Sequence, residues 1–392
     1  MSIADRWLLP DGVEEVLPPQ AWHLESVRRR LLDLFAGWGY ELVITPMVEY
    51  LESLLTGTGK DLDLKTFKVT DRVSGRMMGI RADMTPQVAR IDAHSLSRDG
   101  IVRLCYAGTV LHATADNMLA SRTPISVGAE LFGDSSTRAD LEIVSMMIEA
   151  IRREGISPVH IELGDVGIFR DLVRSANLSG HAEEVLFELI QRKDAAELAG
   201  AVRELGVAAA LSEKISRLPG LCGGTEILAQ ARELFEGDEQ ITVRLDNLFE
   251  VAEGLGVRFG DLDIYYDLSE LRGYNYHTGI VFAGYGAAGQ RFAKGGRYDH
   301  VGEVFGRSRA ATGFDIDLKM LAAGTRPDPE TGRRVHAPPT EANLEAGRWE
   351  LITQLREQGY IVVESADDAG ACDYRVVNDG REWKLVSNPE GH

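Results

Sequence analysis

The chain has 392 residues, of which 44% are hydrophobic, and its 42 basic and 61 acidic residues give a formal net charge of −19 at pH 7. This length is typical of two or three domains, and no run of apolar residues reaches the ~18 needed to span a membrane. Because nucleic-acid binding draws on Lys and Arg contacts to phosphates, the acidic balance argues against a protein that handles tRNA.

The first third of the chain predicts one long helix followed by strands. Apolar residues recur with helical spacing over 20–38, and Gly39 ends this pattern. Residues 40–45 favour a strand, and so do 103–111 and 125–132.

The middle of the chain predicts a change to helical structure. Thr137, with Asp140 three residues later, is typical of a capping box and predicts the start of a helix. Ala, Leu and Glu dominate over 169–260, where helical periods recur, so we expect a helical insertion. Strand-like sequence returns at 263–268 and 280–282.

The C-terminal part predicts a helix, a linker and a small α/β piece. An amphipathic helix is expected over 312–321, and the Pro- and Gly-rich stretch that follows marks a linker. The predicted division is a core in two parts, an insertion between them, a linker and a C-terminal α/β piece, in the order 1–168 (core), 169–260 (insertion), 261–325 (core), 326–343 (linker) and 344–392 (α/β piece).

Signals for targeting and for metal or redox chemistry are weak. Residues 1–6 lack the basic-then-apolar layout of a signal peptide. Cys105, Cys222 and Cys372 are odd in number and share no CxxC spacing. We therefore predict a reduced, cytoplasmic protein with no disulfide, no metal site and no cofactor.

Two short segments are the most informative feature of the sequence. Residues 271–279 are LRGYNYHTG, and residues 295–299 are GGRYD. An arginine, two tyrosines and a histidine within six positions suit a binding pocket, and the two segments together resemble the histidine-recognition segments of the histidyl-tRNA synthetase family. Either segment alone would also fit an ordinary strand or turn.

This resemblance extends over roughly 8–325 and implies a fold. The family has a class II aminoacyl-tRNA synthetase core, an α/β (α+β) fold built on a mostly antiparallel sheet flanked by helices. Residues 37–46 (GWGYELVITP), followed by Glu49, are similar to the first class II motif. That motif forms the dimer interface in the family, so the resemblance implies a homodimer.

Residues 81–85 (RADMT) match the family's Arg-Pro-Glu-Gly-Thr element. In the family the acid and the threonine of this element hold the ammonium group of the amino acid, which makes Asp83 and Thr85 candidate histidine contacts. A carboxylate and a hydroxyl are suitable partners for a cation. The same residues would also fit an ordinary turn capped by Asp83.

Residues 126–133 (SVGAELFG) look like the end of the second class II motif. Strand alternation places Ser126, Gly128 and Glu130 on one face, and the resemblance implies that Glu130 recognises the histidine side chain. Ser126 stands where the family has a glutamine that contacts the amino group. The alternative is that Glu130 is a surface carboxylate on an edge strand.

The resemblance also assigns roles within 271–279. Arg272 matches the arginine that contacts the carboxylate of the amino acid, Tyr276 matches the first tyrosine of a Tyr-Tyr pair, and His277 occupies the second position. A tyrosine hydroxyl can hydrogen-bond an imidazole nitrogen, and a histidine could partly replace it.

The positions that hold ATP in synthetases are not kept. The arginine and glutamate of the second motif fall at His112 and Thr114. The third motif, approximately GFAMGLER, appears as GFDIDLKM, which puts Met320 at the arginine position. Lys319 is the neighbouring residue and would point about 100° away on a helix. Because the loss of one transition-state donor costs on the order of 10²–10³ in rate, we expect no adenylation and no catalytic residue.

A synthetase-like core with a histidine pocket, no ATP clamp and a C-terminal piece of half the usual length resembles the family of ATP phosphoribosyltransferase regulatory subunits. This implies a non-catalytic protein of histidine biosynthesis that activates a short-form catalytic subunit and relays feedback inhibition by histidine. Membrane and tRNA partners are not expected. Two alternatives stay open: an active histidyl-tRNA synthetase and a free-standing histidine-binding paralogue.

Overall fold

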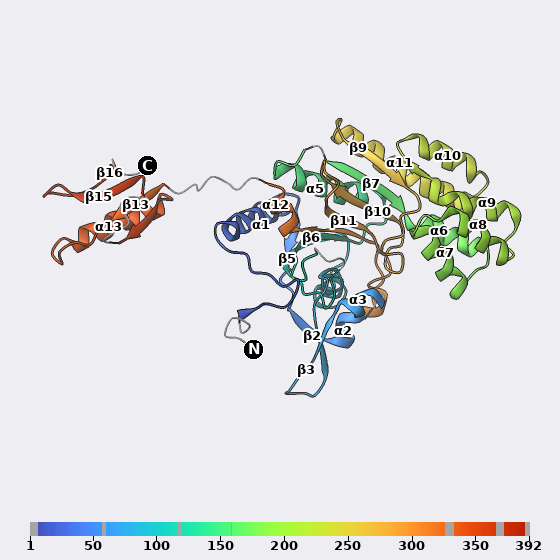
Figure 1. The fold of residues 1–392 in the computed structure, drawn as a ribbon, viewed down its shortest axis with the longest axis horizontal. Helices are drawn as coiled ribbons and strands as arrows, with labels where there is room; N and C mark the ends of the chain where they lie inside the picture. Colours follow the sequence, from blue (N-terminus) through green and yellow to red (C-terminus); the bar gives the residue numbers. More distant parts are fainter. Residues whose placement is uncertain are drawn as a thin grey trace. The chain divides into compact units, whose positions relative to one another are not determined.

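The computed structural model divides the chain into two compact units, Met1–Arg326 and Pro327–His392 (Figure 1). Each unit has its own sheet and its own apolar core. The residues that the structure describes are 7–56, 60–115, 120–157, 159–325, 333–365 and 372–388.

The first unit is built on a nine-stranded sheet with the order β1-β5-β6-β12-β11-β10-β7-β9-β8. Neighbouring strands pair antiparallel, except that β1 pairs parallel with β5 and β7 with β9. The predicted mostly antiparallel sheet is therefore confirmed. Its strands are β1 (Glu41–Leu42), β5 (Val102–Thr109), β6 (Ile125–Phe132), β7 (His160–Asp165), β8 (Cys222–Gly223), β9 (Asp263–Asp267), β10 (Ile280–Tyr285), β11 (Arg291–Arg297) and β12 (Ala311–Asp317).

Three helices cover this sheet near its centre: α1 (Gln20–Gly37), α5 (Thr137–Arg153) and α12 (Leu318–Ala323). The apolar stripe of α1 is buried, as helical amphipathicity requires, and Phe35 on that stripe meets Phe314 of β12 edge-on at 5.7 Å. This contact joins the predicted N-terminal helix to the strand on which much of the site is built.

A smaller antiparallel sheet follows the segment that is similar to the first class II motif. Its order is β2-β4-β3, and short helices pack beside it. The elements of this region are β2 (Val48–Tyr50), α2 (Leu51–Leu55), α3 (Lys60–Lys65), β3 (Phe67–Thr70), β4 (Met77–Ile80), α4 (Thr85–Arg90) and a π-helix (Ile91–Leu96).

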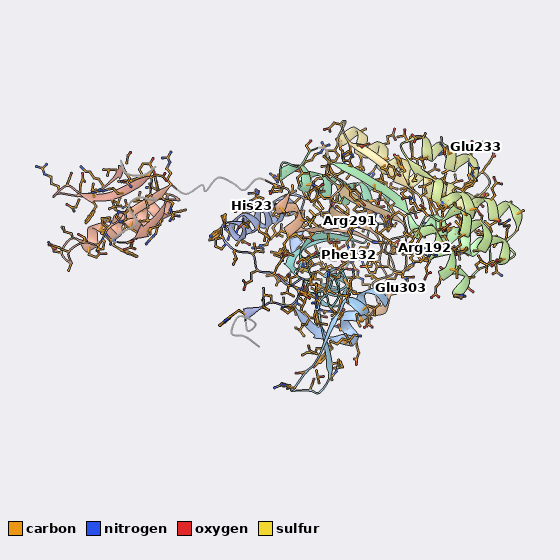
Figure 2. All side chains as sticks on the ribbon, viewed as in Figure 1. His23, Phe132, Arg192, Glu233, Arg291 and Glu303 are labelled. Atoms are coloured by element: carbon orange, nitrogen blue, oxygen red, sulfur yellow. The ribbon has the colours of Figure 1, made fainter. Side chains whose placement is uncertain are left out.

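Helices gather beyond the β7 side of the large sheet, where Figure 2 labels Arg192 and Glu233. Between them the chain forms a short 3-10 helix, Leu218–Gly220, and a second 3-10 helix, Glu303–Phe305, lies later in the core. The helices are α6 (Val166–Ser175), α7 (His181–Gln191), α8 (Ala195–Glu204), α9 (Ala209–Arg217), α10 (Glu226–Leu234) and α11 (Glu239–Arg258).

The second unit is a four-stranded sheet with one helix. The strand order is β14-β13-β15-β16. Its elements are β13 (Arg334–Ala337), α13 (Glu345–Glu357), β14 (Ile361–Glu364), β15 (Tyr374–Asn378) and β16 (Trp383–Ser387). The linker predicted over 326–343 is therefore too long, because β13 lies inside it. Val335 and Ala337 are fully buried, so tertiary packing outweighs the Pro- and Gly-rich composition there.

Three local predictions differ from the structure. The helix expected over 312–321 is strand β12 up to Asp317, whose side chain then caps α12 by accepting from the amides of Lys319 and Met320. The capping box at Thr137 does not form, because the helix already begins at Thr137 with Ser136 as its N-cap, and the Asp140 carboxylate is bound by Arg297 instead. The strand predicted over 40–45 is reduced to two residues.

Among the described helices, none is both long and apolar enough to cross a membrane. Cys105, Cys222 and Cys372 are free thiols.

Candidate functional site

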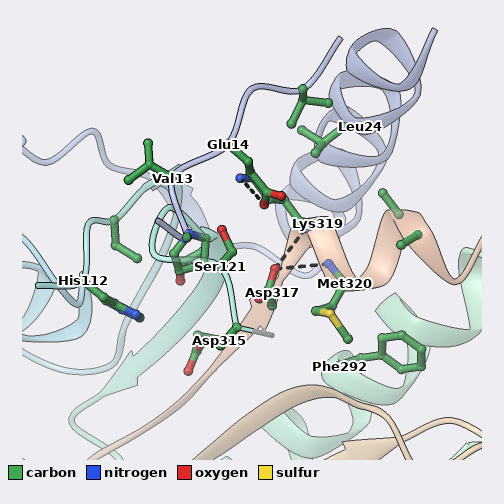
Figure 3. Close-up of a pocket in the computed structure, with 18 of the residues that line it drawn as sticks. Val13, Glu14, Leu24, His112, Ser121, Phe292, Asp315, Asp317, Lys319 and Met320 are labelled. Atoms are coloured by element: carbon green, nitrogen blue, oxygen red, sulfur yellow. Dashed lines mark hydrogen bonds and ion pairs between the residues drawn. The ribbon is translucent and has the colours of Figure 1, made fainter. Parts of the chain in front are cut away.

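A groove of about 1320 Å³ lies in the first unit, beside strand β12 (Figure 3). Its lining comes from the N-terminal segment 12–17, from β6, β11 and β12, and from the start of α12. Of the residues predicted to bind histidine, Asp83 and Ser126 line this groove. Of the predicted ATP positions, His112 and Met320 line it, and Thr114 is exposed on the following loop.

The cations that remain near the ATP positions are already engaged. Lys319 Nζ lies 3.0 Å from Glu14 Oε1 and 3.2 Å from Thr123 Oγ1 (Figure 3). Arg122, in the loop after His112, donates to the backbone carbonyls of His112 at 2.9 Å and Asp11 at 3.1 Å. The charge of Lys319 is therefore balanced by Glu14, and the Arg122 guanidinium is held in place by backbone carbonyls.

Strand β12 adds negative charge to the groove. Asp315 and Asp317 line it, at positions where the third synthetase motif has alanine and glycine. Lys294 of β11 stands opposite Asp315 in the strand register. Burial raises the pKa of Asp315, while the charge of Lys294 lowers it. These two aspartates could have been found from the sequence by comparing every position of the third motif rather than the arginine position alone.

Glu130 is buried away from solvent and does not line the groove. It sits in the interior of the sheet on β6 and is 1% exposed, so the edge-strand alternative is wrong. Tyr106 donates to Glu130 Oε1 at 3.1 Å, and Tyr298 donates to Oε2. Burial raises the pKa of Glu130 to about 8, against the lowering effect of hydrogen bonds from Tyr298 and Thr85.

Glycine makes room for this carboxylate. Gly313 of β12 is the register partner of Glu130, and a Cβ at Gly313 would lie 1.6 Å from Glu130 Oε2. Gly128, the other small residue on the predicted face, lies beneath the Tyr106 hydroxyl, with 2.5 Å between an added Cβ and that oxygen. Tyr106 therefore requires glycine at position 128, and the Glu130 carboxylate requires glycine at position 313.

The 271–279 and 295–299 segments meet beside Glu130. The ring of Tyr276 stacks on that of Tyr298, with centroids 5.0 Å apart. Among the described residues, the buried Tyr276 hydroxyl has no hydrogen-bond partner. His277 packs between Gly273 and Gly296, where an added Cβ would lie within 3 Å of the imidazole. Burial lowers the pKa of His277 to about 4, so the ring is neutral at pH 7.

Asp83 lines the groove, and Thr85 lies beside Tyr106, which binds Glu130. Asp83 Oδ1 accepts from the Thr85 amide at 2.9 Å, so the turn that we left as an alternative does form. The Thr85 hydroxyl lies 3.3 Å from that of Tyr106. Burial and, to a smaller extent, the charge of Asp83 raise the pKa of Glu130 and that of Tyr276.

Arg272 forms ion pairs with acidic residues outside this cluster. Its guanidinium is paired with Glu162 and, at 2.6 Å, with Glu270, and donates to the Tyr285 hydroxyl at 3.1 Å. Carboxylate oxygens of Glu162, Glu270 and Asp267 lie within 4.8 Å of one another, but arginine already neutralises two of these groups and Lys193 pairs with the third. Glu270 is only two residues away, but sequence reasoning could not find Glu162, which is 110 residues away.

Comparisons with known proteins agree with this geometry. A sequence model of the family described as histidyl-tRNA synthetase matches residues 12–321. The chain is 49% identical to the ATP phosphoribosyltransferase regulatory subunits of Azotobacter vinelandii and of Stutzerimonas stutzeri, and each alignment covers 98% of this chain and 99% of the relative.

Solved structures share the fold. The Bacillus halodurans protein described as an ATP phosphoribosyltransferase regulatory subunit/histidyl-tRNA synthetase matches with a TM-score of 0.81 and 27% identity, over 93% of this chain and 94% of that one. A chain of the ATP phosphoribosyl transferase (HisG:HisZ) complex of Thermotoga maritima matches with a TM-score of 0.59 and 18% identity, over 77% of this chain and 98% of that one. The expected class II synthetase-like fold is confirmed.

Proposed function

This chain belongs to the family of ATP phosphoribosyltransferase regulatory subunits, which has the histidyl-tRNA synthetase fold, and we propose that it activates a short-form catalytic subunit and relays feedback inhibition by histidine. The family acts in histidine biosynthesis. One contrast within the site carries the proposal. The tyrosine-bound Glu130 is kept, while His112 and Met320 stand at the two ATP-clamping positions.

The ATP half of the site lacks what adenylation requires. Attack on an α-phosphate depends on fixed cations that neutralise the charge developing there. Lys319 is paired with Glu14, and Asp315 and Asp317 face the space that phosphates would enter. Each missing donor costs on the order of 10²–10³ in rate, so the chain has a regulatory role rather than a catalytic one.

The histidine half of the site offers a suitable set of polar groups. Histidine entering from the groove would meet Asp83 first, where its ammonium group finds a carboxylate. Beyond Asp83 the imidazole would reach the unpartnered Tyr276 hydroxyl and Glu130. An imidazole N–H bonded to Glu130 favours the ionised carboxylate, and therefore bound histidine lowers the pKa of Glu130. Arg272, held by Glu162 and Glu270, takes no part in this contact.

The homodimer implied by the first class II motif is supported by exposed apolar residues. Large side chains on and around that motif face solvent, and Ile44 is 87% exposed. Contiguous apolar surface of this kind is typical of an interface between copies. The exposed residues of this region are Leu42, Ile44, Met47, Val48 and Ile101. We propose that they form the dimer contact. We also propose that the protein is located in the reducing cytoplasm.

A phosphoribosyltransferase assay of the catalytic subunit, with and without this chain and titrated with histidine, tests the function. We expect the chain to raise the rate and histidine to lower it. Glu130→Gln should weaken calorimetric histidine binding at least about tenfold, since a buried charged hydrogen bond is lost. The matched control is Glu154→Gln, a buried carboxylate that is bound by Arg30 elsewhere in the core. No gain in rate on adding the chain would refute the regulatory role.

Histidine-dependent ATP–pyrophosphate exchange separates this function from that of an active synthetase. We expect the purified chain to give none, and robust exchange would overturn the proposal in favour of the synthetase. Sedimentation of the chain at micromolar concentration tests the dimer, and Ile44→Asp should convert it to monomer.

A further inference from the structure

The loop 271–278 reaches in two directions from the site. Tyr276 extends inward, where its ring stacks on Tyr298 beside Glu130. Tyr274, two residues earlier, extends outward into the helical insertion. The sequence LRGYNYHTG therefore places one tyrosine against the pocket and another against helices that line no part of the groove.

Aromatic and polar contacts hold Tyr274 in the insertion. Its ring centroid lies 5.3 Å from that of Phe169 on α6 and 5.6 Å from that of Phe187 on α7. Its hydroxyl donates to Glu183 Oε1, also on α7, at 2.6 Å. Burial raises the pKa of this hydroxyl, and the charge of Glu183 raises it further, so the phenol keeps its proton. Tyr274 thus joins the loop to two helices at once.

Arg170 of α6 fixes both ends of the same short stretch. Its Nη2 donates to the carbonyl oxygen of Tyr274 at 2.7 Å and to that of His277 at 2.9 Å, and its guanidinium lies 4.7 Å from the centre of the Tyr274 ring. The first amide of α6, on Val166, donates to Gly279 at 3.2 Å. Because Tyr276 lies between the two carbonyls that Arg170 binds, a backbone shift at Tyr276 that displaces either carbonyl also moves Arg170 or breaks a hydrogen bond.

Helix α6 is in turn fixed to α11. Arg244 of α11 binds Asp171 at 2.6 Å and Asp165 at 3.3 Å. Gly167, in the first turn of α6, lies so close to Arg244 that an added Cβ would be 2.0 Å from the guanidinium. A displacement of α6 is therefore carried to the rest of the insertion rather than absorbed locally.

The unpartnered hydroxyl of Tyr276 makes the loop responsive to a ligand. A buried hydroxyl without a partner is destabilised relative to one that is hydrogen-bonded, so a ligand that bonds this oxygen favours one position of Tyr276. Ligand binding can shift a conformational equilibrium only through such a difference between states. The same loop then passes that preference to α6 and α7 through Arg170 and Tyr274.

We propose that residues 271–278 couple the Glu130 pocket to the helical insertion, with Arg170 and Tyr274 as positioning residues that transmit pocket occupancy to α6 and α7. This inference rests on the proposed function, because it takes histidine as the ligand. The output surface of the regulatory subunit accordingly lies on the insertion helices.

Hydrogen–deuterium exchange and calorimetry on the full chain test the coupling. In the wild type, histidine should slow amide exchange at least about threefold in α6 and α7. Tyr274→Phe keeps the ring but loses the bond to Glu183, so histidine affinity should stay within about twofold while the protection of α7 disappears. In the complex with the catalytic subunit, this variant should keep its histidine-free activity and need at least about fivefold more histidine for half-inhibition.

Tyr40→Phe is the matched control, since Tyr40 is a buried tyrosine that donates to Glu142 of α5 at 2.9 Å, outside both the loop and the helical insertion. It should behave as wild type in all three measurements. Wild-type protection confined to the pocket segments would overturn the coupling and leave the proposed function intact, and so would a Tyr274→Phe variant with wild-type histidine sensitivity. Failure of the wild type to bind histidine at all would instead refute the histidine part of the proposed function, and the coupling with it.

Discussion

The Glu130 cluster and the groove at the ATP positions are both built on strands β6 and β12. Only four residues separate them along each strand, yet they differ in burial and in charge. At one end of the ladder Glu130 faces Gly313, and two tyrosines bond the carboxylate. Four residues along, Ser126 faces Asp317, and the groove carries Asp315 and Asp317 beside the cations Arg291, Lys294 and Lys319, with Met320 at the position of the ATP-clamping arginine.

The difference between the two halves follows from burial. Around Glu130 every change leaves a buried polar atom without a partner or a cavity among tyrosines, and such networks lose stability when only one member is altered. Groove positions such as Met320 are partly exposed, where substitutions cost little folding stability. ATP chemistry can therefore be lost without harm to the fold, while the geometry of recognition is kept by the stability of the sheet.

The largest expected effect tests the buried half through pH. Between pH 4.5 and about 8 folded Glu130 holds a proton that the unfolded chain has released, so the free energy of unfolding falls as pH rises through this window. Glu130→Gln cannot ionise and should lack this slope. Relative to wild type it should gain on the order of 4 kcal/mol between pH 5 and pH 9, measured by urea unfolding. Parallel pH profiles would show that Glu130 is not held protonated.

A second prediction tests the room that glycine leaves for the carboxylate. Gly313→Ala forces Glu130 or β12 to move, because the new Cβ meets Glu130 Oε2 and the carbonyl oxygen of Ala129. We expect a loss of about 3 kcal/mol in unfolding free energy, together with weaker histidine binding. Gly200→Ala is the control, since Gly200 lies within α8 with nothing inside 4 Å of an added Cβ. It should gain up to about 1 kcal/mol, and equal losses in both variants would contradict the packing argument.

The smallest expected effect belongs to the groove. Glu14→Gln removes the partner of Lys319, but the Glu14 side chain is 54% exposed, and pairs of this kind contribute no more than about 1 kcal/mol. Thermal unfolding should change little, and the change should vanish in high salt. Glu15→Gln is the neighbouring control, for which the described residues provide no ion pair. A loss of several kcal/mol on removing Glu14 would show that the groove is as tightly constrained as the Glu130 cluster.

Sequence reasoning succeeded where local pattern and burial agree. The face shared by Ser126, Gly128 and Glu130 follows from strand alternation, and the sheet buries Glu130 as that face requires. It failed over 312–321, where a stretch taken for an amphipathic helix belongs, up to Asp317, to a central strand that pairs with β6 and β11. The same burial packs the candidate contact His277 between two glycines, an arrangement that the sequence did not indicate.

From the sequence alone, residue types at fixed spacings carried the family resemblance, and that resemblance predicted the fold class, the two segments that meet at the pocket and the loss of the ATP clamp. Only the tertiary structure decided that Arg272 is bound by Glu162 and Glu270, and that Tyr274 leaves the pocket for the insertion. The physical reason is that Glu162, which binds Arg272, and Glu183, which binds Tyr274, lie on another strand and another helix, 110 and 91 residues away. Such contacts are selected by packing and charge in three dimensions rather than by local pattern.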